Sequence, residues 1–322
     1  MPKVAFVSFT HTIPSSQLTG FWAEQAKRAE EAGEMTYISE DFKLLSAQTE
    51  LLEETGITLE NVGWNDPTIN WEDYSAIVIR TTWDYFRADN YPKFLAWFDR
   101  IEKLPVWNPV AIMRWNSDKH YLSELAQMGV RIPPSVWVEK GEQANIAQIM
   151  RDNGWTSAIA KPCVGGGADG LLRYDTIEQA EAGQDEFARA SSERAMIVQQ
   201  LVTQIITEGE WSFLFFMGAD GTPQFSHALQ KVPVSGDIRV QGGQNIPRIP
   251  SENMIEQARD MLLGAQSLFP DPLLYARVDV IAIDGVLMLM ELELIEPYFF
   301  LKEMNDVAPI ERFIRALQVA LG

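Results

Sequence analysis

The stretch Tyr275-Ala-Arg-Val-Asp-Val-Ile-Ala-Ile-Asp-Gly-Val-Leu-Met-Leu-Met-Glu-Leu-Glu-Leu294 contains two apolar runs on either side of an Asp-Gly pair. This pattern predicts an antiparallel hairpin with a tight turn. Side chains alternate between the faces of a strand, so Arg277 shares a face with Asp279. By the same rule, Glu291 shares a face with Glu293. Acids in such apolar strands need a compensating charge, and Mg²⁺ can supply it through carboxylate oxygens.

The register of this hairpin decides whether its acids meet. A strict two-residue turn would pair Asp279 with Met290 and would put Asp279 and Glu291 on opposite faces. A three-residue loop over residues 284–286, or a bulge, would shift the pairing by one and bring Asp279 opposite Glu291. We therefore expect an odd-length loop or a bulge at the Asp-Gly turn. The alternative is an exposed hairpin face with solvated acids.

A glycine-rich stretch follows another apolar run. Lys161 ends the strand-like segment that begins at Ala158, and it precedes Gly165, Gly166 and Gly167. Glycine lets backbone N–H groups approach phosphate oxygens, and the lysine adds positive charge beside them. The spacing fits neither a Walker A motif nor a dinucleotide-binding fingerprint, because a strand follows the loop. We interpret it as a phosphate-binding loop, with a plain surface hairpin loop as the alternative.

Three further cations are candidates for anion binding. Lys119 lies in the first turn of a predicted helix, where a cation opposes the helix dipole, so a nearby anion would explain it. Lys231 and Arg239 flank a Val-Pro-Val-Ser-Gly-Asp stretch that is typical of a loop. Taken alone, each of these cations fits a solvated surface position better than a ligand contact.

Composition limits the class of protein. The chain has 322 residues, of which 46% are hydrophobic and 22% are charged, so we expect a globular protein of two or three domains. The net charge of −19 disfavours nucleic acids and anionic membranes as partners. Cys163 is the only cysteine, which excludes an intrachain disulfide and fits a reducing compartment. With neither a signal peptide nor a long apolar run, we expect a cytoplasmic protein.

The pattern of strands and helices predicts an α/β fold in three parts. Strands alternating with helices, including the apolar run from Tyr74 to Arg80, predict a parallel α/β domain over residues 1–110. Residues 111–198 mix short strands with helices, among them a helix over residues 177–190. Long β segments dominate residues 199–322, which predicts an antiparallel sheet.

The end of the buried strand near Arg80 is a candidate substrate site. Ligands of open α/β sheets bind beyond the carboxyl ends of the strands, and Thr82 and Asp84 lie there with Arg80. A charged pair such as Arg80 and Asp84 would suit a zwitterionic substrate. The alternative is a packed loop with one salt bridge.

These features occur in the order that is typical of the ATP-grasp superfamily, which the chain resembles along essentially its whole length. The resemblance implies a Rossmann-like N-terminal domain, a central α+β lid over ATP and a C-terminal antiparallel catalytic domain. It also implies a set of ATP contacts: Lys119, Lys161, the glycine loop, an adenine hinge of Gln199, Gln200, Leu201 and Val202, and Glu210 on the ribose.

The same resemblance implies roles for the hairpin. Two Mg²⁺ ions, with Mn²⁺ as a substitute, would be held by Asp279, Glu291 and Glu293. Lys231 and Arg239 would neutralise phosphates, and Arg277 would stabilise a tetrahedral intermediate. The chain departs from D-alanine–D-alanine ligase and glutathione synthetase because Glu293 replaces an asparagine. It departs again where Glu296-Pro-Tyr replaces a Ser-Pro-Gly-type segment.

A closer resemblance is to the ATP-grasp group that includes the D-cycloserine-forming ligase. Five motifs carry it: Arg80-Thr-Thr-Trp-Asp-Tyr85, Asn108-Pro with Arg114-Trp-Asn-Ser-Asp-Lys119, Glu208-Gly-Glu-Trp-Ser212, Gly236-Asp-Ile-Arg-Val-Gln241 and Glu291-Leu-Glu-Leu-Ile-Glu-Pro297.

This group implies an ATP-dependent ligase that converts a small amino-acid-like carboxylate to an acyl phosphate and joins it to an amine, with intramolecular closure as one form. The expected assembly is a homodimer or homotetramer. The alternatives are a glutathione-synthetase-like peptide ligase, a kinase or phosphotransferase on the same nucleotide site, and a nucleotide-binding regulatory protein without turnover.

Overall fold

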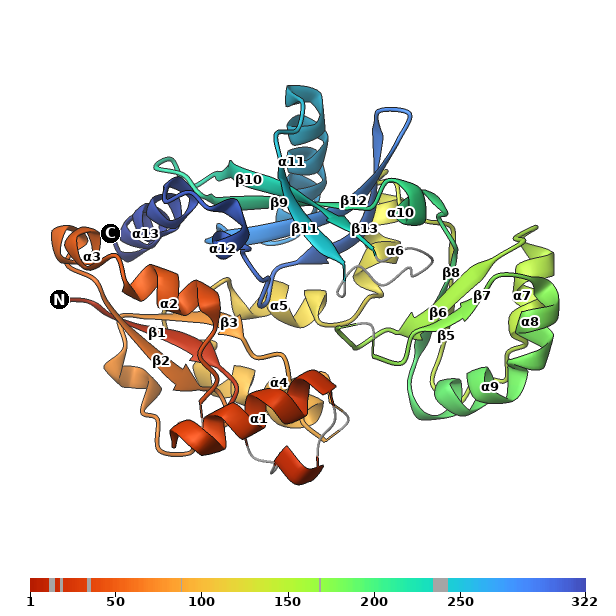
Figure 1. Ribbon diagram of the computed structural model, residues 1–322, viewed down its shortest axis with the longest axis horizontal. Helices are drawn as coiled ribbons and strands as arrows, with labels where there is room; N and C mark the ends of the chain where they lie inside the picture. Colours follow the sequence, from red (N-terminus) through yellow and green to blue (C-terminus); the bar gives the residue numbers. More distant parts are fainter. Residues whose placement is uncertain (12–14, 18–19, 34–35, 88, 168, 234–242) are drawn as a thin grey trace.

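The computed structural model describes residues 1–11, 15–17, 20–33, 36–87, 89–167, 169–233 and 243–322. The strands of these residues form three sheets that follow one another along the chain (Figure 1). Among the described residues, no helix combines the length and apolarity needed to cross a membrane.

The N-terminal part is a parallel sheet in the order β2-β1-β3-β4. All six residues of β3 are buried, as its continuous apolar run predicts. Helix α4 turns Phe94, Trp97, Phe98 and Ile101 inward at helical spacing. The elements are β1 (Lys3–Ser8), α1 (Gly20–Ala32), α2 (Glu40–Ser46), α3 (Thr49–Thr55), β2 (Thr58–Gly63), β3 (Ala76–Thr81), α4 (Tyr91–Ile101) and β4 (Val106–Trp107), with short 3₁₀ turns at Ser15–Gln17 and Trp71–Asp73.

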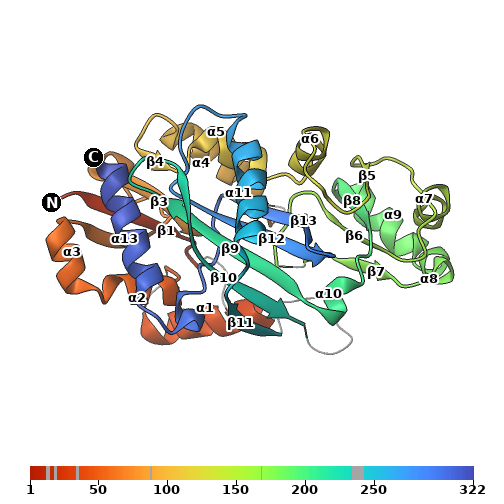
Figure 2. The same ribbon diagram turned by 90° about the horizontal axis from the view of Figure 1, so that it is seen from above.

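The central part is an antiparallel sheet in the order β5-β8-β6-β7, with its own apolar core. It lies at one end of the molecule in both views (Figures 1 and 2). The single helix expected over residues 177–190 is wrong, because the chain breaks at Gly183 into α8 and α9. The elements are β5 (Ser135–Val138), α7 (Ile146–Asp152), β6 (Ala158–Pro162), β7 (Leu172–Tyr174), α8 (Ile177–Ala182), α9 (Gln184–Glu193) and β8 (Met196–Gln200).

The C-terminal part is an antiparallel sheet in the order β11-β10-β9-β12-β13. Two helices pack on this C-terminal sheet although they precede the central sheet in sequence: α5 (Val110–Asn116) and α6 (Tyr121–Gln127). Asn116 Nδ2 of α5 donates to the carbonyl of Leu292 at 2.7 Å. The other elements are α10 (Gln204–Thr207), β9 (Glu210–Met217), β10 (Pro223–Val232), β11 (Gln244–Arg248), α11 (Glu252–Gln266), β12 (Tyr275–Ile283), β13 (Val286–Glu293), α12 (Leu301–Met304) and α13 (Ala308–Leu321).

The two faces of this sheet differ in a way that positions the site. Helix α11 covers one face, where Phe213 and Phe215 of β9 join the main core. On the opposite face, Leu214 and Phe216 pack with α13 in a second core. Further toward the start of β9 this second face becomes polar, with Ser212 buried there. The site therefore begins where the apolar cover of α13 ends.

Asn108 joins the N-terminal and C-terminal sheets. Its side chain is fully buried, and Nδ2 donates to the carbonyls of Tyr275 at 2.9 Å and Leu294 at 2.8 Å. Its Oδ1 accepts from the amide of Leu274 at 2.8 Å. One side chain thus satisfies backbone groups at the start of β12 and just after the end of β13.

We expect Asn108→Ala to lower the free energy of unfolding by about 3 kcal/mol, because it leaves several buried backbone groups without partners. Urea denaturation followed by circular dichroism measures this loss. The matched control is Asn253→Ala, since Asn253 is exposed on α11. Equal stability of the two variants would contradict the joining role of Asn108.

Candidate active site

The turn between β12 and β13 is a strict two-residue turn. Ile283 pairs with Val286, which leaves Asp284 and Gly285 as the turn residues. Both have positive φ, 52° and 78°, as the Asp-Gly type I′ turn requires. The odd-length loop that we considered is therefore absent from this turn.

A bulge further along the hairpin brings the acids together. Val280 pairs with Leu289, but Asp279 pairs with Glu291, so Met290 is an extra residue in β13. The expectation of a bulge is confirmed, but its expected position at the turn is wrong. Asp279 and Glu291 now lie opposite each other on the face that the metal hypothesis requires.

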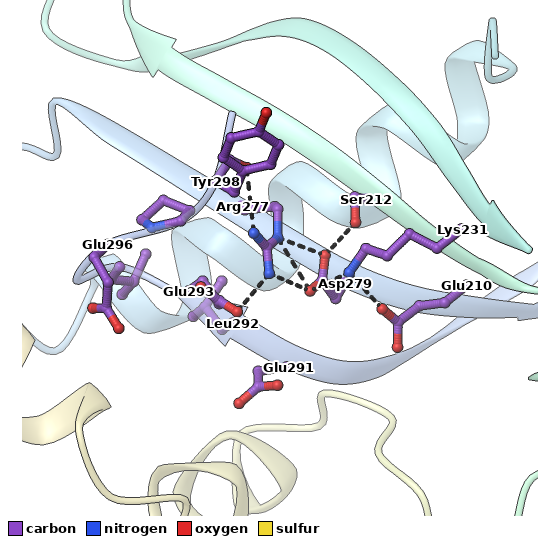
Figure 3. Close-up of polar contacts among 12 residues, drawn as sticks. Glu210, Ser212, Lys231, Arg277, Asp279, Glu291, Leu292, Glu293, Glu296 and Tyr298 are labelled. Atoms are coloured by element: carbon purple, nitrogen blue, oxygen red, sulfur yellow. Dashed lines mark hydrogen bonds and ion pairs between the residues drawn. The ribbon is translucent and has the colours of Figure 1, made fainter. Parts of the chain in front are cut away.

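Asp279 is the centre of a buried polar network (Figure 3). The residue is 2% exposed, and its carboxylate accepts from Ser212 Oγ at 2.5 Å and Lys231 Nζ at 2.9 Å. Arg277 donates to the same carboxylate from Nε at 3.0 Å and from Nη2 at 2.9 Å. Burial alone would raise the pKa of Asp279, but the two cations outweigh burial and hold that pKa below its usual range.

Lys231 links Asp279 to a second buried acid. Its Nζ lies 2.7 Å from Oε1 of Glu210, the first residue of β9. Burial raises the pKa of Glu210, and Lys231 opposes that rise. The acid expected to hold ribose therefore lies against a lysine expected to hold phosphate, within one network.

Arg277 extends the network to Glu293, with Nη2 2.5 Å from Oε1. Burial raises the pKa of Glu293 to about 7, while Arg277 acts in the opposite direction. The arginine and the last acid of the hairpin thus compensate each other's charge.

Lys119 brings the glycine loop to the hairpin. Its Nζ donates to the carbonyl of Gly165 at 2.7 Å and lies 2.9 Å from Glu291. Lys161 on β6 shares this environment: burial lowers its pKa, and the charge of Glu291 partly offsets that effect. Lys119 therefore joins the loop to Glu291, and Lys161 feels the charge of the same carboxylate. Their role in binding phosphate stays a prediction.

Two glycines of this loop are required by its geometry. A Cβ at Gly166 would lie 2.9 Å from the ring of Phe86 in the N-terminal part, closer than carbon atoms normally approach. Gly167 has a φ of 64°, a backbone angle that residues other than glycine rarely adopt.

The predicted adenine hinge borders an apolar wall. Leu201 clusters with Ile205, Ile281 and Met290, and Val202 packs against the same cluster. Gln199 is buried, and its Nε2 donates to Ser135 Oγ at 3.0 Å. The amide of Gln200 donates to the carbonyl of Pro134. The role of this segment in binding adenine stays a prediction.

The predicted substrate residues are engaged inside the protein. Arg80 is 1% exposed, donates to the carbonyl of Pro297 at 2.5 Å and lies 3.4 Å over the ring of Phe299. Asp84 accepts from Trp64 Nε1 at 2.8 Å. For both residues this geometry fits the packed-loop alternative, and their role in binding substrate stays a prediction. Thr82 is fully buried beside them.

Three observations complete the comparison with the sequence. Arg239 lies outside the described residues. Ser212 is a site residue that the sequence analysis missed, although strand alternation from Glu210 would have indicated its face. Met290 was missed because the sequence does not mark which residue of β13 forms the bulge and packs against the hinge.

Asp118, His120 and Cys163 lie behind Lys119 with their potential ligand atoms within 4.8 Å of one another. Both ring nitrogens of His120 face carboxylates, Asp118 at 2.6 Å and Glu139 at 3.1 Å. Although burial opposes it, these acids raise the pKa of His120, and their contacts occupy both ring nitrogens that a metal would need. Burial raises the pKa of the Cys163 thiol to about 12. We therefore infer that these residues position Lys119, whose amide donates to the carbonyl of Cys163.

A lid-like antiparallel sheet with a glycine loop, set against a hairpin of carboxylates, is the arrangement of the ATP-grasp ligases. Solved structures agree. D-alanine–D-alanine ligase from Bacillus anthracis, complexed with ATP, is similar in fold with a TM-score of 0.62 and 12% identity, over 100% of this chain and 97% of that one. The crystal structure of D-cycloserine synthetase DcsG gives a TM-score of 0.75 at 25% identity, over 99% and 100% of the two chains.

The sequence comparisons are more specific. Residues 34–108 match the family described as D-cycloserine synthetase DcsG, N-terminal domain. The cycloserine biosynthesis protein DcsG from Streptomyces lavendulae is 30% identical over 284 residues, which cover 81% of this chain and 88% of the relative. The chain belongs to the DcsG family and is an ATP-grasp carbon–nitrogen ligase.

We expect Lys231→Met to lower the free energy of unfolding by about 3 kcal/mol at pH 8. Glu210 would lose its buried counter-charge, and Asp279 would keep only Arg277. An acid whose pKa is raised in the folded state binds protons more tightly there, so the deficit should shrink as the pH falls toward 5. Urea denaturation at both pH values measures it. Lys302→Met is the control, since that side chain is 67% exposed. A deficit that is the same at both pH values would contradict this charge balance.

Proposed function

We propose that the chain activates a small amino-acid-like carboxylate with ATP and joins the resulting acyl phosphate to an amine, releasing ADP and phosphate. The observation that carries this proposal is that Lys119 joins the glycine loop to Glu291, while Lys231 and Arg277 hold the other two carboxylates of the hairpin. Such a set of lysines, glycine amides and carboxylates suits a polyphosphate and its counter-ions.

The donor set fits Mg²⁺. Asp279, Glu291 and Glu293 offer hard oxygen ligands on one face of two paired strands, and carboxylate oxygens are the ligands that Mg²⁺ prefers. Each of these acids is paired here with a lysine or arginine, which shows that the site tolerates positive charge at these positions. Two Mg²⁺ ions held by these acids would neutralise the phosphate oxygens, and Mn²⁺ offers the same ligand preference.

The lysines perform the remaining charge neutralisation. Lys119 and Lys161 border the glycine loop, and Lys231 lies on the other side of the acids, so a triphosphate between them meets cations from both sides. Arg239 is proposed to act with them. Since Lys119 pairs with Glu291, and Lys231 with Glu210 and Asp279, phosphate binding would exchange one anionic partner of these two lysines for another.

The chemistry requires two displacements. A carboxylate oxygen of the substrate attacks the γ-phosphorus, and the bond from that phosphorus to the oxygen of ADP breaks. The amine nitrogen then attacks the carbonyl carbon, the carbon–oxygen bond to phosphate breaks, and the nitrogen loses a proton. Arg277 is proposed to stabilise the oxyanion between these events, because its guanidinium is held rigidly by Asp279 and Glu293.

The relative named D-cycloserine synthetase suggests the substrate class. We infer a small amino-acid-like substrate, with ring closure within one molecule or coupling of two molecules both compatible with the steps above. A homodimer or homotetramer and a cytoplasmic location remain predictions from sequence.

We expect Glu291→Gln to abolish ATP-dependent ligation, at least 1,000-fold in kcat, while the fold stays intact. The amide keeps the size of the side chain but removes a charge that the phosphate counter-ions need. Coupled ADP release, across a panel of amino acids and dipeptides, measures turnover, and circular dichroism checks the fold. Retained activity in this variant would exclude the metal assignment.

Product analysis separates the proposal from the kinase alternative. A ligase forms an amide in proportion to ADP and requires both the carboxylate and the amine, whereas a kinase leaves a stable phosphorylated product. The exposed substitution Glu311→Gln on α13 serves as the matched control and should keep full activity. Absence of ADP release across the whole panel would contradict the proposed function.

A further inference from the structure

Glu296 differs from the other acids of the site because none of the described lysines and arginines forms an ion pair with its carboxylate. The residue is 8% exposed, and among the described residues its carboxylate takes part in no ion pair and no hydrogen bond. Each of the other four carboxylates lies within 2.9 Å of a lysine or arginine nitrogen: Glu210 and Asp279 with Lys231, Asp279 and Glu293 with Arg277, and Glu291 with Lys119.

Glu296 lies where the N-terminal and C-terminal sheets meet. Its carbonyl accepts from Trp83 Nε1 at 3.3 Å, and the carbonyl of the next residue, Pro297, accepts from Arg80. Figure 3 places the Glu296 carboxyl group beyond Glu293, outside the network of hydrogen bonds around Asp279. It therefore borders both the metal-binding face and the end of strand β3.

A buried acid without an ion pair is costly. Burial raises the pKa of Glu296 well above its usual range, and the charge of Glu293 adds to that effect, while the charges of Arg80 and Arg277 oppose it only in part. Polar atoms at the end of β3 also lack partners among the described residues: the buried hydroxyl of Thr82, the residue before Trp83, and Nε and Nη1 of Arg80. Buried polar groups are normally paired, so unpaired groups at this junction indicate a missing ligand.

We propose that Glu296 binds the ammonium group of an amino-acid substrate and so selects amino acids over carboxylic acids that lack the amino group. The inference rests on the proposed function for the position of the substrate carboxylate, which would face Glu293 and its neighbours. Glu296 follows Glu293 by three residues, so a short amino acid could reach both positions. A cation there would restore the charge balance that the other acids already have.

Binding tests the inference without turnover. D-serine, L-serine and glycerate, the analogue with a hydroxyl in place of the amino group, are each titrated calorimetrically into the full chain saturated with Mg²⁺ and a non-hydrolysable ATP analogue. We expect serine to bind at least 10-fold more tightly than glycerate to the wild-type protein. Glu296→Gln should remove that preference by weakening serine binding, and leave glycerate and nucleotide binding unchanged. Glu296→Asp should restore part of the preference, and Glu311→Gln should retain it fully.

Stability gives a second criterion. Substitution of a glutamate that serves only packing would destabilise the protein, whereas substitution of an unpaired acid that serves a ligand should not. The melting temperature of Glu296→Gln should therefore equal or exceed that of the wild type. Equal or absent binding of serine and glycerate to the wild type, or a preference that survives in Glu296→Gln, would overturn the inference.

Trapping with hydroxylamine separates this inference from the proposed function. Hydroxylamine converts an acyl phosphate to a hydroxamate without knowledge of the natural amine. If serine binds preferentially through Glu296 but no amino acid of the panel yields a hydroxamate, the proposed function fails and the ammonium site stands. If hydroxamates form equally well from amino and hydroxy acids, the ammonium site fails and the proposed function stands.

Discussion

The buried pairing of Asp279 with Arg277 and Lys231 is the constraint on which the rest of the site depends. A carboxylate at 2% exposure is stable only if charge compensation is close, and two cations and a serine hydroxyl provide it. Because each cation also contacts a second acid, Glu210 or Glu293, acids and cations alternate through the site. A polyphosphate that binds there must replace an acid as the partner of each cation that it contacts.

The hairpin achieves this arrangement with one extra residue. A tight Asp-Gly turn is favourable for closing the strands, yet alone it would put Asp279 and Glu291 on opposite faces. The bulge at Met290 reconciles the turn with the site, and it also turns the Met290 side chain toward Leu201 in the predicted hinge. A local irregularity of the strand thus links the acid cluster to the wall of the nucleotide site.

The sequence predicted the elements whose signals are local. The buried run of β3, the hairpin and the lysine before the glycine loop all followed from periodicity and composition. Features set by tertiary contacts could not be predicted in this way. The break at Gly183, the burial of Arg80 over Phe299, and the lack of an ion pair at Glu296 each depend on which segments the fold brings together.

Transfer of oxygen from the substrate carboxylate to phosphate tests the central claim most directly. The amino acid that gives the highest hydroxamate yield is labelled with ¹⁸O in its carboxylate and turned over with unlabelled ATP and a coupling amine. If the carboxylate attacks the γ-phosphorus, each phosphate released carries one ¹⁸O atom from the substrate, which mass spectrometry detects. Unlabelled phosphate from a reaction that still forms the amide would contradict the acyl-phosphate account.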